Sequence, residues 1–199
     1  MDEHSPTKTN TMTYQYEETY QNLKWADSPL EAGDYEACSF RNCDFSEAEI
    51  NELNFIECEF SDCNLSNAEL DDTTFQEVSF KDCKLLGVQF EHAKSFGFAV
   101  RFEQCQLNHA SFFKVKLSQS SFLHCQLQEV DFTEADMRQT VVSYCDLADA
   151  IFENTQLGRA DFRHSRNYII DPDLNPIKGA KFSMPEVVGL LKKYKLVIE

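Results

Sequence analysis

Apolar residues recur at every fifth position of this chain, and this spacing limits its fold more than any other feature. The first unbroken run begins at Trp25 and ends at Phe90. The second run begins two residues out of phase at Phe102 and ends at Phe162. A helix needs apolar spacings of three and four and a strand needs two, so neither explains the pattern. An internal repeat of this kind predicts a solenoid.

Small residues stand two places before most of these apolar centres, and all eight cysteines occupy this position. Six cysteines recur at intervals of twenty or twenty-two, namely Cys43, Cys63, Cys83, Cys105, Cys125 and Cys145. Two inward residues in every five, one small and one large, suit a chain that turns a corner at each repeat. The interval of twenty then predicts four sides to a coil. The repeats make about seven coils, which stack at the inter-strand spacing of roughly 4.8 Å.

The cysteines are predicted to be reduced thiols of the core, because each takes an inward position that alanine, threonine, valine or serine takes elsewhere. Stacked β-carbons about 4.8 Å apart are farther than the roughly 3.8 Å that a disulfide prefers. A spacing of five also differs from the C-x-x-C spacing of zinc sites. His124 and His164 share a column, but Tyr144 lies between them. We therefore expect neither a metal site nor a cofactor.

The composition favours one elongated domain outside the membrane. No apolar run approaches eighteen residues, and residues 1–21 are polar, without the apolar segment of a signal peptide. We expect a cytoplasmic protein with a flexible tail over residues 1–21 and a β-helix over residues 22–166. The sequence also has no glycine-rich phosphate loop, HExxH motif or nucleophile elbow. An enzyme is therefore not expected.

Acidic residues gather in the amino-terminal half of the predicted rod. The net charge is −16, and residues 26–90 hold sixteen Asp and Glu against three Lys and Arg. Residues 91–170 hold ten acids against eight bases. The charge density of the acidic half is comparable with that of duplex DNA, which has one charge per roughly 1.7 Å. This surface can compete for a protein groove that holds DNA, or it can simply keep the rod soluble. The same sign disfavours direct binding of nucleic acid.

The candidates for binding a partner are outward carboxylates and two aromatic residues. The carboxylates are Asp44, Glu47, Glu49, Glu52, Glu57, Glu59, Asp62, Asp72, Glu77 and Asp82. The two aromatic residues, Phe96 and Phe98, lie in residues 91–101, where two extra residues predict a bulge near the middle of the rod. Both compete for one inward position, so one is expected to be exposed, where it can anchor a partner.

Residues 167–199 are predicted to end the rod. Turn signals at 171–176 precede a final repeat, and Ser183 to Glu186 has the pattern of a capping box at the start of a short α-helix. One helical face carries the cap or dimer candidates Val187, Leu190, Leu191 and Tyr194. This helix is expected to cover the last coil, and it can also contact a second copy of the chain. Residues 196–198 are predicted to add a short strand.

Units such as Ala48-Glu49-Ile50, Cys63-Asn64-Leu65, Cys145-Asp146-Leu147 and Ala160-Asp161-Phe162 resemble those of the pentapeptide-repeat family, over roughly residues 20–165. This resemblance implies a right-handed quadrilateral β-helix. The stretches 83–88 and 171–182 look most like the branch of quinolone-resistance and microcin-immunity proteins. Members of that branch are described as DNA mimics that act on DNA gyrase and topoisomerase IV. This chain differs from the best-known resistance proteins in having no long projecting loop.

Two functions are therefore weighed. The first is a non-enzymatic DNA mimic that binds a type II topoisomerase and modulates it or protects it from quinolones or peptide toxins. The second is a scaffold or regulator that binds an unrelated protein. The uneven distribution of acids is needed by the first function and not by the second.

Overall fold

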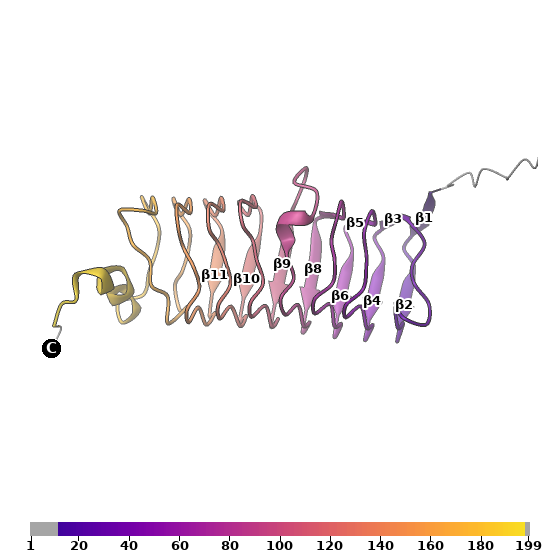
Figure 1. Cartoon of the computed structure of the whole chain (residues 1–199), viewed down its shortest axis with the longest axis horizontal. Helices are drawn as coiled ribbons and strands as arrows, with labels where there is room; N and C mark the ends of the chain where they lie inside the picture. Colours follow the sequence, from indigo (N-terminus) through magenta and orange to yellow (C-terminus); the bar gives the residue numbers. More distant parts are fainter. Residues whose placement is uncertain (1–11, 198–199) are drawn as a thin grey trace, which may run out of the picture.

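The five-residue frame closes into four walls, and the computed structural model describes this arrangement for residues 12–197 (Figure 1). The chain forms a parallel β-solenoid of about seven coils, followed by one short helix. All apolar centres of the frame from Tyr35 to Phe162 are buried. The predicted solenoid and its coil of twenty residues are thus confirmed.

Strands form two of the walls. Wall 1 is a parallel sheet of β1 (Thr13–Tyr16), β3 (Gly33–Glu36), β5 (Asn54–Ile56) and β7 (Thr74–Gln76). Wall 2 is a parallel sheet of β2 (Thr19–Gln21), β4 (Ser39–Arg41), β6 (Glu59–Ser61), β8 (Val78–Lys81), β9 (Val100–Glu103), β10 (Ser121–Leu123) and β11 (Val141–Ser143). Phe40 lies opposite Phe60, a step of twenty, whereas Phe80 lies opposite Phe102, a step of twenty-two. The two extra residues are therefore absorbed between β8 and β9.

Isolated parallel bridges form the other two walls. Wall 3 runs from the bridge between Lys24 and Asp44 to the bridge between Asp146 and Arg166. Wall 4 includes the bridge between Glu49 and Glu69 and the bridge between Asp131 and Ile151. Every bridge links residues of successive coils, so outward side chains twenty apart form columns along the rod.

The interior is built from columns of stacked rings and thiols. The Phe40 and Phe60 rings are parallel, with centroids 4.6 Å apart, and edge-to-face contacts link neighbouring walls. All eight cysteines are free and buried, as expected. The Cys63 thiol donates to the carbonyl oxygen of Phe40 at 3.4 Å, so the inward thiol also satisfies a backbone acceptor.

The predicted bulge is present near the middle of the rod. It begins with the 3-10 helix η1 (Phe90–His92) and continues as a projecting loop (Figure 1). Phe98 is 6% exposed and packs against the rings of Phe75 and Phe90, whereas Phe96 is 84% exposed. One aromatic residue therefore takes the inward position and the other is displaced outward. Phe98 is wrong as a partner-binding candidate because it belongs to the core.

The solenoid begins earlier than the sequence analysis places it. Residues 1–11 lie outside the described part of the chain, but residues 12–21 contain β1 and β2 rather than a tail. β1 pairs with β3 in register, from Thr13 opposite Gly33 to Tyr16 opposite Glu36. Among the described residues this stretch packs against one neighbouring coil only, so its side chains meet a weaker packing constraint and the regular frame is not needed.

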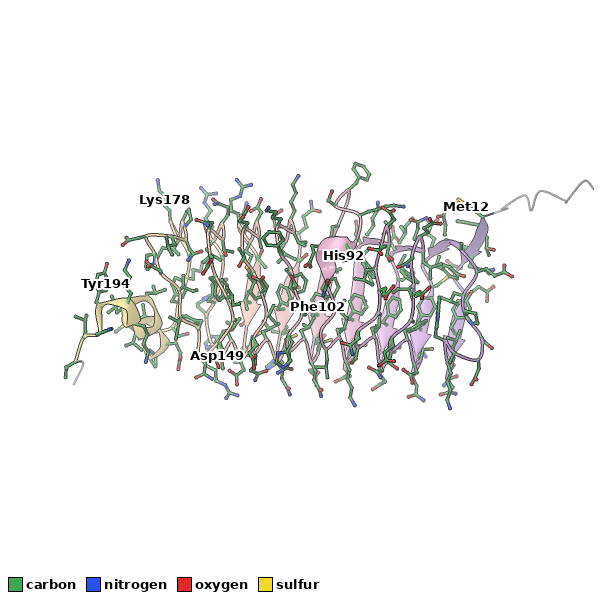
Figure 2. All side chains as sticks on the ribbon, viewed as in Figure 1. Met12, His92, Phe102, Asp149, Lys178 and Tyr194 are labelled. Carbon is green, nitrogen blue, oxygen red and sulfur yellow. The ribbon has the colours of Figure 1, made fainter. Side chains whose placement is uncertain are left out.

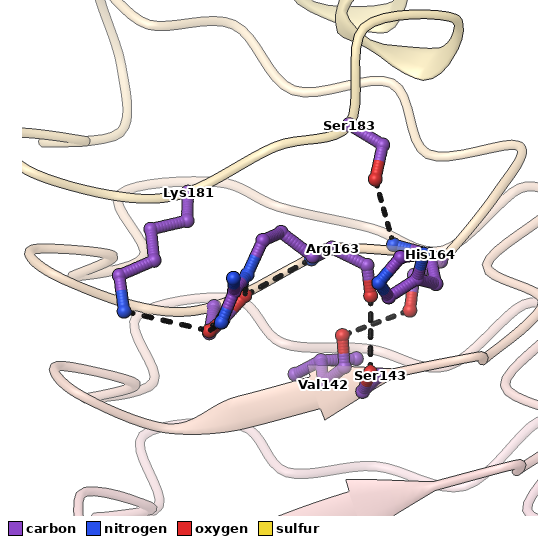
Figure 3. A network of polar contacts seen from close by, with 8 residues as sticks. Val142, Ser143, Arg163, His164, Lys181 and Ser183 are labelled. Atoms are coloured by element: carbon purple, nitrogen blue, oxygen red, sulfur yellow. Dashed lines mark hydrogen bonds and ion pairs between the residues drawn. The ribbon is translucent and has the colours of Figure 1, made fainter.

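The carboxyl-terminal helix η2 (Glu186–Tyr194) is a 3-10 helix, so the predicted α-helix is wrong. The predicted capping box does not form within it, since its first turn has no side-chain cap. Instead the Ser183 hydroxyl accepts from the backbone N–H of His164 at 2.9 Å (Figure 3). The Glu186 carboxylate accepts from the backbone N–H of Asn167 at 3.1 Å. These two side chains satisfy donors of the preceding coil and thereby attach the helix to the rod.

The cap also packs against the last coil through apolar side chains on one of its faces. Leu190 is buried, and Val187 packs against the core, whereas Leu191 and Tyr194 are 37% and 56% exposed. Residues 196 and 197 are not in a strand, and Ile198 lies outside the described residues. The four cap or dimer candidates are thus divided: two cover the last coil and two face away from it.

Candidate protein-binding surface

The ten acidic candidates are all exposed, and those twenty residues apart form columns along the rod. Seven of them occupy corners with a left-handed backbone conformation, namely Glu47, Glu52, Glu57, Asp62, Asp72, Glu77 and Asp82. At such a corner the backbone N–H of Glu57 donates to the carbonyl oxygen of Gln76 at 2.8 Å, one residue before Glu77. The fold therefore fixes the backbone of each corner carboxylate while its side chain extends into solvent.

The walls divide these carboxylates into two unequal groups. Walls 4 and 1, with the corners that border them, contain eleven acids and no Lys or Arg within residues 28–37, 47–57 and 67–77. We call this surface the acidic side; it consists of Glu31, Asp34, Glu36, Glu47, Glu49, Glu52, Glu57, Glu69, Asp71, Asp72 and Glu77. Walls 2 and 3 carry Asp44, Glu59, Asp62 and Asp82 among the bases Arg41, Lys81 and Lys84. We call this second surface the mixed side.

The structure therefore brings together six of the ten acidic candidates and separates them from the other four. The candidate set also omits five members of the acidic side, namely Glu31, Asp34, Glu36, Glu69 and Asp71. A separate count of acids and bases in each half-coil of ten residues reveals the division, because consecutive half-coils form opposite halves of the rod. A single count over residues 26–90 averages the two sides.

Local hydrogen bonds hold some of these carboxylates in place. Tyr14 donates its hydroxyl to Glu36 at 2.8 Å, and this bond raises the pKa of Tyr14. On the mixed side, Asp44 accepts from the hydroxyl and the backbone N–H of Ser46, which lower the pKa of that carboxyl. The His92 imidazole lies 3.1 Å from the Asp71 carboxylate, at the end of the acidic side nearest the bulge.

The exposed ring of Phe96 adjoins this end of the acidic side. A β-carbon added at Gly97 would lie 2.8 Å from the Gln76 amide nitrogen, so the bulge rests directly on the coil that contains Glu77. A shallow hollow of about 400 Å³ lies nearby and is lined by Glu69, Asp71, His92 and five neighbours. Carboxylates, an exposed aromatic ring and an open hollow can bind a basic protein surface.

The described residues contain no cluster of three or more His, Cys, Asp or Glu arranged to hold a metal ion. His124, Tyr144 and His164 do form one column, with successive ring centroids 4.7 Å apart. Within residues 12–197 no helix is long and apolar enough to cross a membrane.

A comparison with known protein families identifies the five-residue repeat. The family model described as "Pentapeptide repeat region" matches residues 34–112 and 98–162. No curated protein matches the sequence.

Three solved structures illustrate the structural similarity. A trypsin-treated form of QnrB1, described as a plasmid-mediated fluoroquinolone resistance protein, is 18% identical, and the match covers 97% of this chain and 95% of that chain with a TM-score of 0.54. A second trypsin-treated form of QnrB1 is 18% identical over 94% of this chain and 100% of that chain, with a TM-score of 0.56. HetL, a protein involved in heterocyst differentiation regulation from the cyanobacterium Nostoc sp. strain PCC 7120, is 13% identical, with coverages of 86% and 90% and a TM-score of 0.45. At this level of identity, the likeness to QnrB1 shows a shared fold.

Proposed function

Because this chain belongs to the pentapeptide repeat family, we propose that it acts without catalysis, by binding a protein partner through its acidic side. The partner that this surface fits best is a type II topoisomerase, either DNA gyrase or topoisomerase IV. Such an enzyme has a basic groove for duplex DNA, and the acidic side supplies the opposite charge. In this proposal the protein modulates the topoisomerase or protects it from quinolones or peptide toxins.

The observation that carries the proposal is the density of charge on a surface without bases. Eleven carboxylates occupy three coils, an axial length of about 14 Å at roughly 4.8 Å per coil. Duplex DNA has about eight charges over the same length, at one per roughly 1.7 Å. The acidic side therefore matches or exceeds the charge that the groove normally meets. Solubility alone does not require that all bases of these coils lie on the opposite walls.

The structural similarity to QnrB1 supports the same partner class, since that protein is described by its fluoroquinolone resistance. Phe96 is proposed as an anchor at one end of the contact, because exposed aromatic residues beside a charged surface contribute strongly to binding. We further propose that the cap contacts a second copy through its outward residues Leu191 and Tyr194.

The test is a supercoiling assay with purified gyrase, with and without a quinolone. The wild-type protein is expected to inhibit supercoiling and to reduce drug-stabilised cleavage complexes. Reversal of four exposed corners of the acidic side (Glu52→Lys, Glu57→Lys, Asp72→Lys and Glu77→Lys) should abolish both effects.

A matched control reverses four carboxylates of the mixed side (Asp44→Lys, Glu59→Lys, Asp62→Lys and Asp82→Lys). It changes the net charge equally and should retain most of the effect, with circular dichroism confirming that both variants fold. An equal loss in the two variants would show that total charge matters and the acidic side does not. Complete inactivity of the wild-type protein toward both enzymes would favour a scaffold with an unrelated partner.

A further inference from the structure

The amino-terminal end of the rod exposes apolar residues that the next coil buries. Within the described residues, β1 and β2 are the edge strands of their sheets and pair on one side only. The inward residues of this first coil are partly exposed: Tyr20, Leu23, Trp25 and Leu30. Their equivalents one coil later are at most 2% exposed: Phe40, Cys43, Phe45 and Ile50. An exposed edge of this kind favours association with another chain.

The same end is acidic. Residues 12–32 contain one base, Lys24, and four exposed acids, which are Glu17, Glu18, Asp27 and Glu31. These carboxylates belong to the same coil as the partly exposed apolar residues.

The opposite end combines apolar residues with the opposite charge. The outward face of the cap has a shallow hollow of about 370 Å³ that is lined by Val188, Leu191, Leu196, Lys192 and Lys195. Lys193 makes ion pairs with Asp171 and Asp173, which leaves Lys192 and Lys195 as the exposed cations of this face. Figure 2 shows Tyr194 of the cap at one end of the rod and Met12 at the other.

We propose that the chain associates head to tail, with the cap of one copy seated on the first coil of the next copy. Charge complementarity favours this arrangement, because the lysines of the cap meet the acids of the first coil. A two-fold contact between two caps would bring the lysines of both copies together, and a contact between two first coils would do the same with acids. The inference rests on the proposed self-association through the cap, and topoisomerase binding is independent of it.

The length of the rod keeps the repulsion between the acidic sides of neighbouring copies small. In a head-to-tail row, the copies repeat at the length of the rod, about 34 Å for seven coils at roughly 4.8 Å each. Since the acidic side spans about 14 Å of this length, a gap of about 20 Å separates it from the acidic side of the next copy. That gap is more than twice the screening length of about 8 Å at physiological ionic strength. A head-to-tail contact also leaves one free end of each type, so a straight row can continue to grow.

Sedimentation velocity of the full chain over a wide range of protein concentration provides the test, together with the fluorescence of Trp25, the single tryptophan. The mean mass is expected to rise beyond that of a dimer, and the Trp25 emission should shift to shorter wavelength as the cap covers it. High salt should reduce both changes.

Charge-swapped variants identify the two surfaces. Glu17→Lys with Glu18→Lys, and separately Lys192→Glu with Lys195→Glu, should each weaken association by about tenfold. The four substitutions together should restore it, because the two ends are then complementary again. Glu103→Lys with Glu129→Lys, which changes two exposed acids in the middle of the rod, should leave association as in wild type.

Two outcomes would overturn the inference. A plateau at the dimer with unchanged Trp25 emission would show pairing of two caps, since the tryptophan lies at the other end. A monomer at every concentration would show that the ends do not associate. Neither result bears on the supercoiling assay, so the two proposals fail separately.

Discussion

At the scale of single residues, two buried tyrosines differ in one hydrogen bond. Tyr35 and Tyr168 are each 2% exposed. The Tyr35 hydroxyl donates to the carbonyl oxygen of Glu31 at 2.8 Å, whereas the buried Tyr168 hydroxyl has no hydrogen-bond partner among residues 12–197. Leaving a buried polar group without a partner costs about 1–3 kcal/mol. Tyr168→Phe should therefore raise the melting temperature, and Tyr35→Phe should lower it. Equal effects of the two substitutions would contradict this account.

Burial raises the pKa of both phenols to about 12 from 10. The neutral phenol is thus favoured in the folded state, and its contribution to stability is complete below about pH 10 and is lost as the pH rises toward 12. Tyr168→Phe removes one of these groups, so its free energy of unfolding should fall less steeply with pH in this range than that of wild type. Urea titrations at several alkaline pH values measure the slope, and an unchanged slope would argue against the assignment.

All eight cysteine thiols are buried within the rod. Burial raises the pKa of Cys58 to about 12, so almost none of this thiol is the reactive thiolate near neutral pH. A thiol-alkylating reagent should label no cysteine of the native protein and all eight after unfolding. Mass spectrometry counts the labels. Rapid labelling of the native protein would show that the thiol columns are accessible.

At the scale of elements, the packing of the bulge and of the cap against the rod depends on one or two residues each. Phe98 fills the inward position of the bulge, and Phe96 projects from it. Phe98→Ala should destabilise the protein by about 3–5 kcal/mol, as expected for a buried phenylalanine. Phe96→Ala should leave stability almost unchanged. Chemical denaturation compares them, and similar losses of stability would mean that both rings pack in the core.

The cap depends on the close approach of Gly189 to the last coil. A β-carbon at Gly189 would lie 2.1 Å from the carbonyl oxygen of Tyr168, so Gly189→Ala must push the cap away from the rod. The matched control is Gly158→Ala, whose β-carbon would meet its nearest neighbour at 3.7 Å. We expect faster hydrogen exchange around the cap in the first variant and wild-type exchange in the second. Identical exchange in both variants would show that the cap does not rest on Tyr168.

At the scale of the whole molecule, the periodic part of the fold could be predicted from the sequence and the irregular parts could not. The frame from Trp25 to Phe162 predicts the coil of twenty and the buried cysteines, because every side chain of a solenoid interior meets the same constraint. That constraint is relaxed at Thr13–Tyr16, which pairs on one side only within the described residues, so the sequence predicts a tail where the structure has a strand. Ser183 and Glu186 have the pattern of a helix cap, but they bond to the preceding coil, and sequence spacing cannot distinguish these partners.

For the acidic surface, the sequence predicts which residues are exposed acids, but it does not predict how the walls divide them. The register places Glu52 in one column with Asp72 and Glu57 in one column with Glu77, as the coil of twenty residues implies. The division into an acidic side and a mixed side depends on which wall each half-coil forms. Once the four walls are known, Lys81 and Lys84 are seen to lie opposite the acidic side rather than among its carboxylates.

If the acidic side occupies the place of DNA on a topoisomerase, as we propose, the protein and duplex DNA must compete for the enzyme. Fluorescently labelled protein would be bound to gyrase, and unlabelled duplex DNA would then be added while fluorescence anisotropy is followed. Duplex DNA is expected to displace the protein, and the variant with four reversed corners of the acidic side is expected not to bind. Simultaneous binding of DNA and protein, with unchanged anisotropy at saturating DNA, would contradict this proposal.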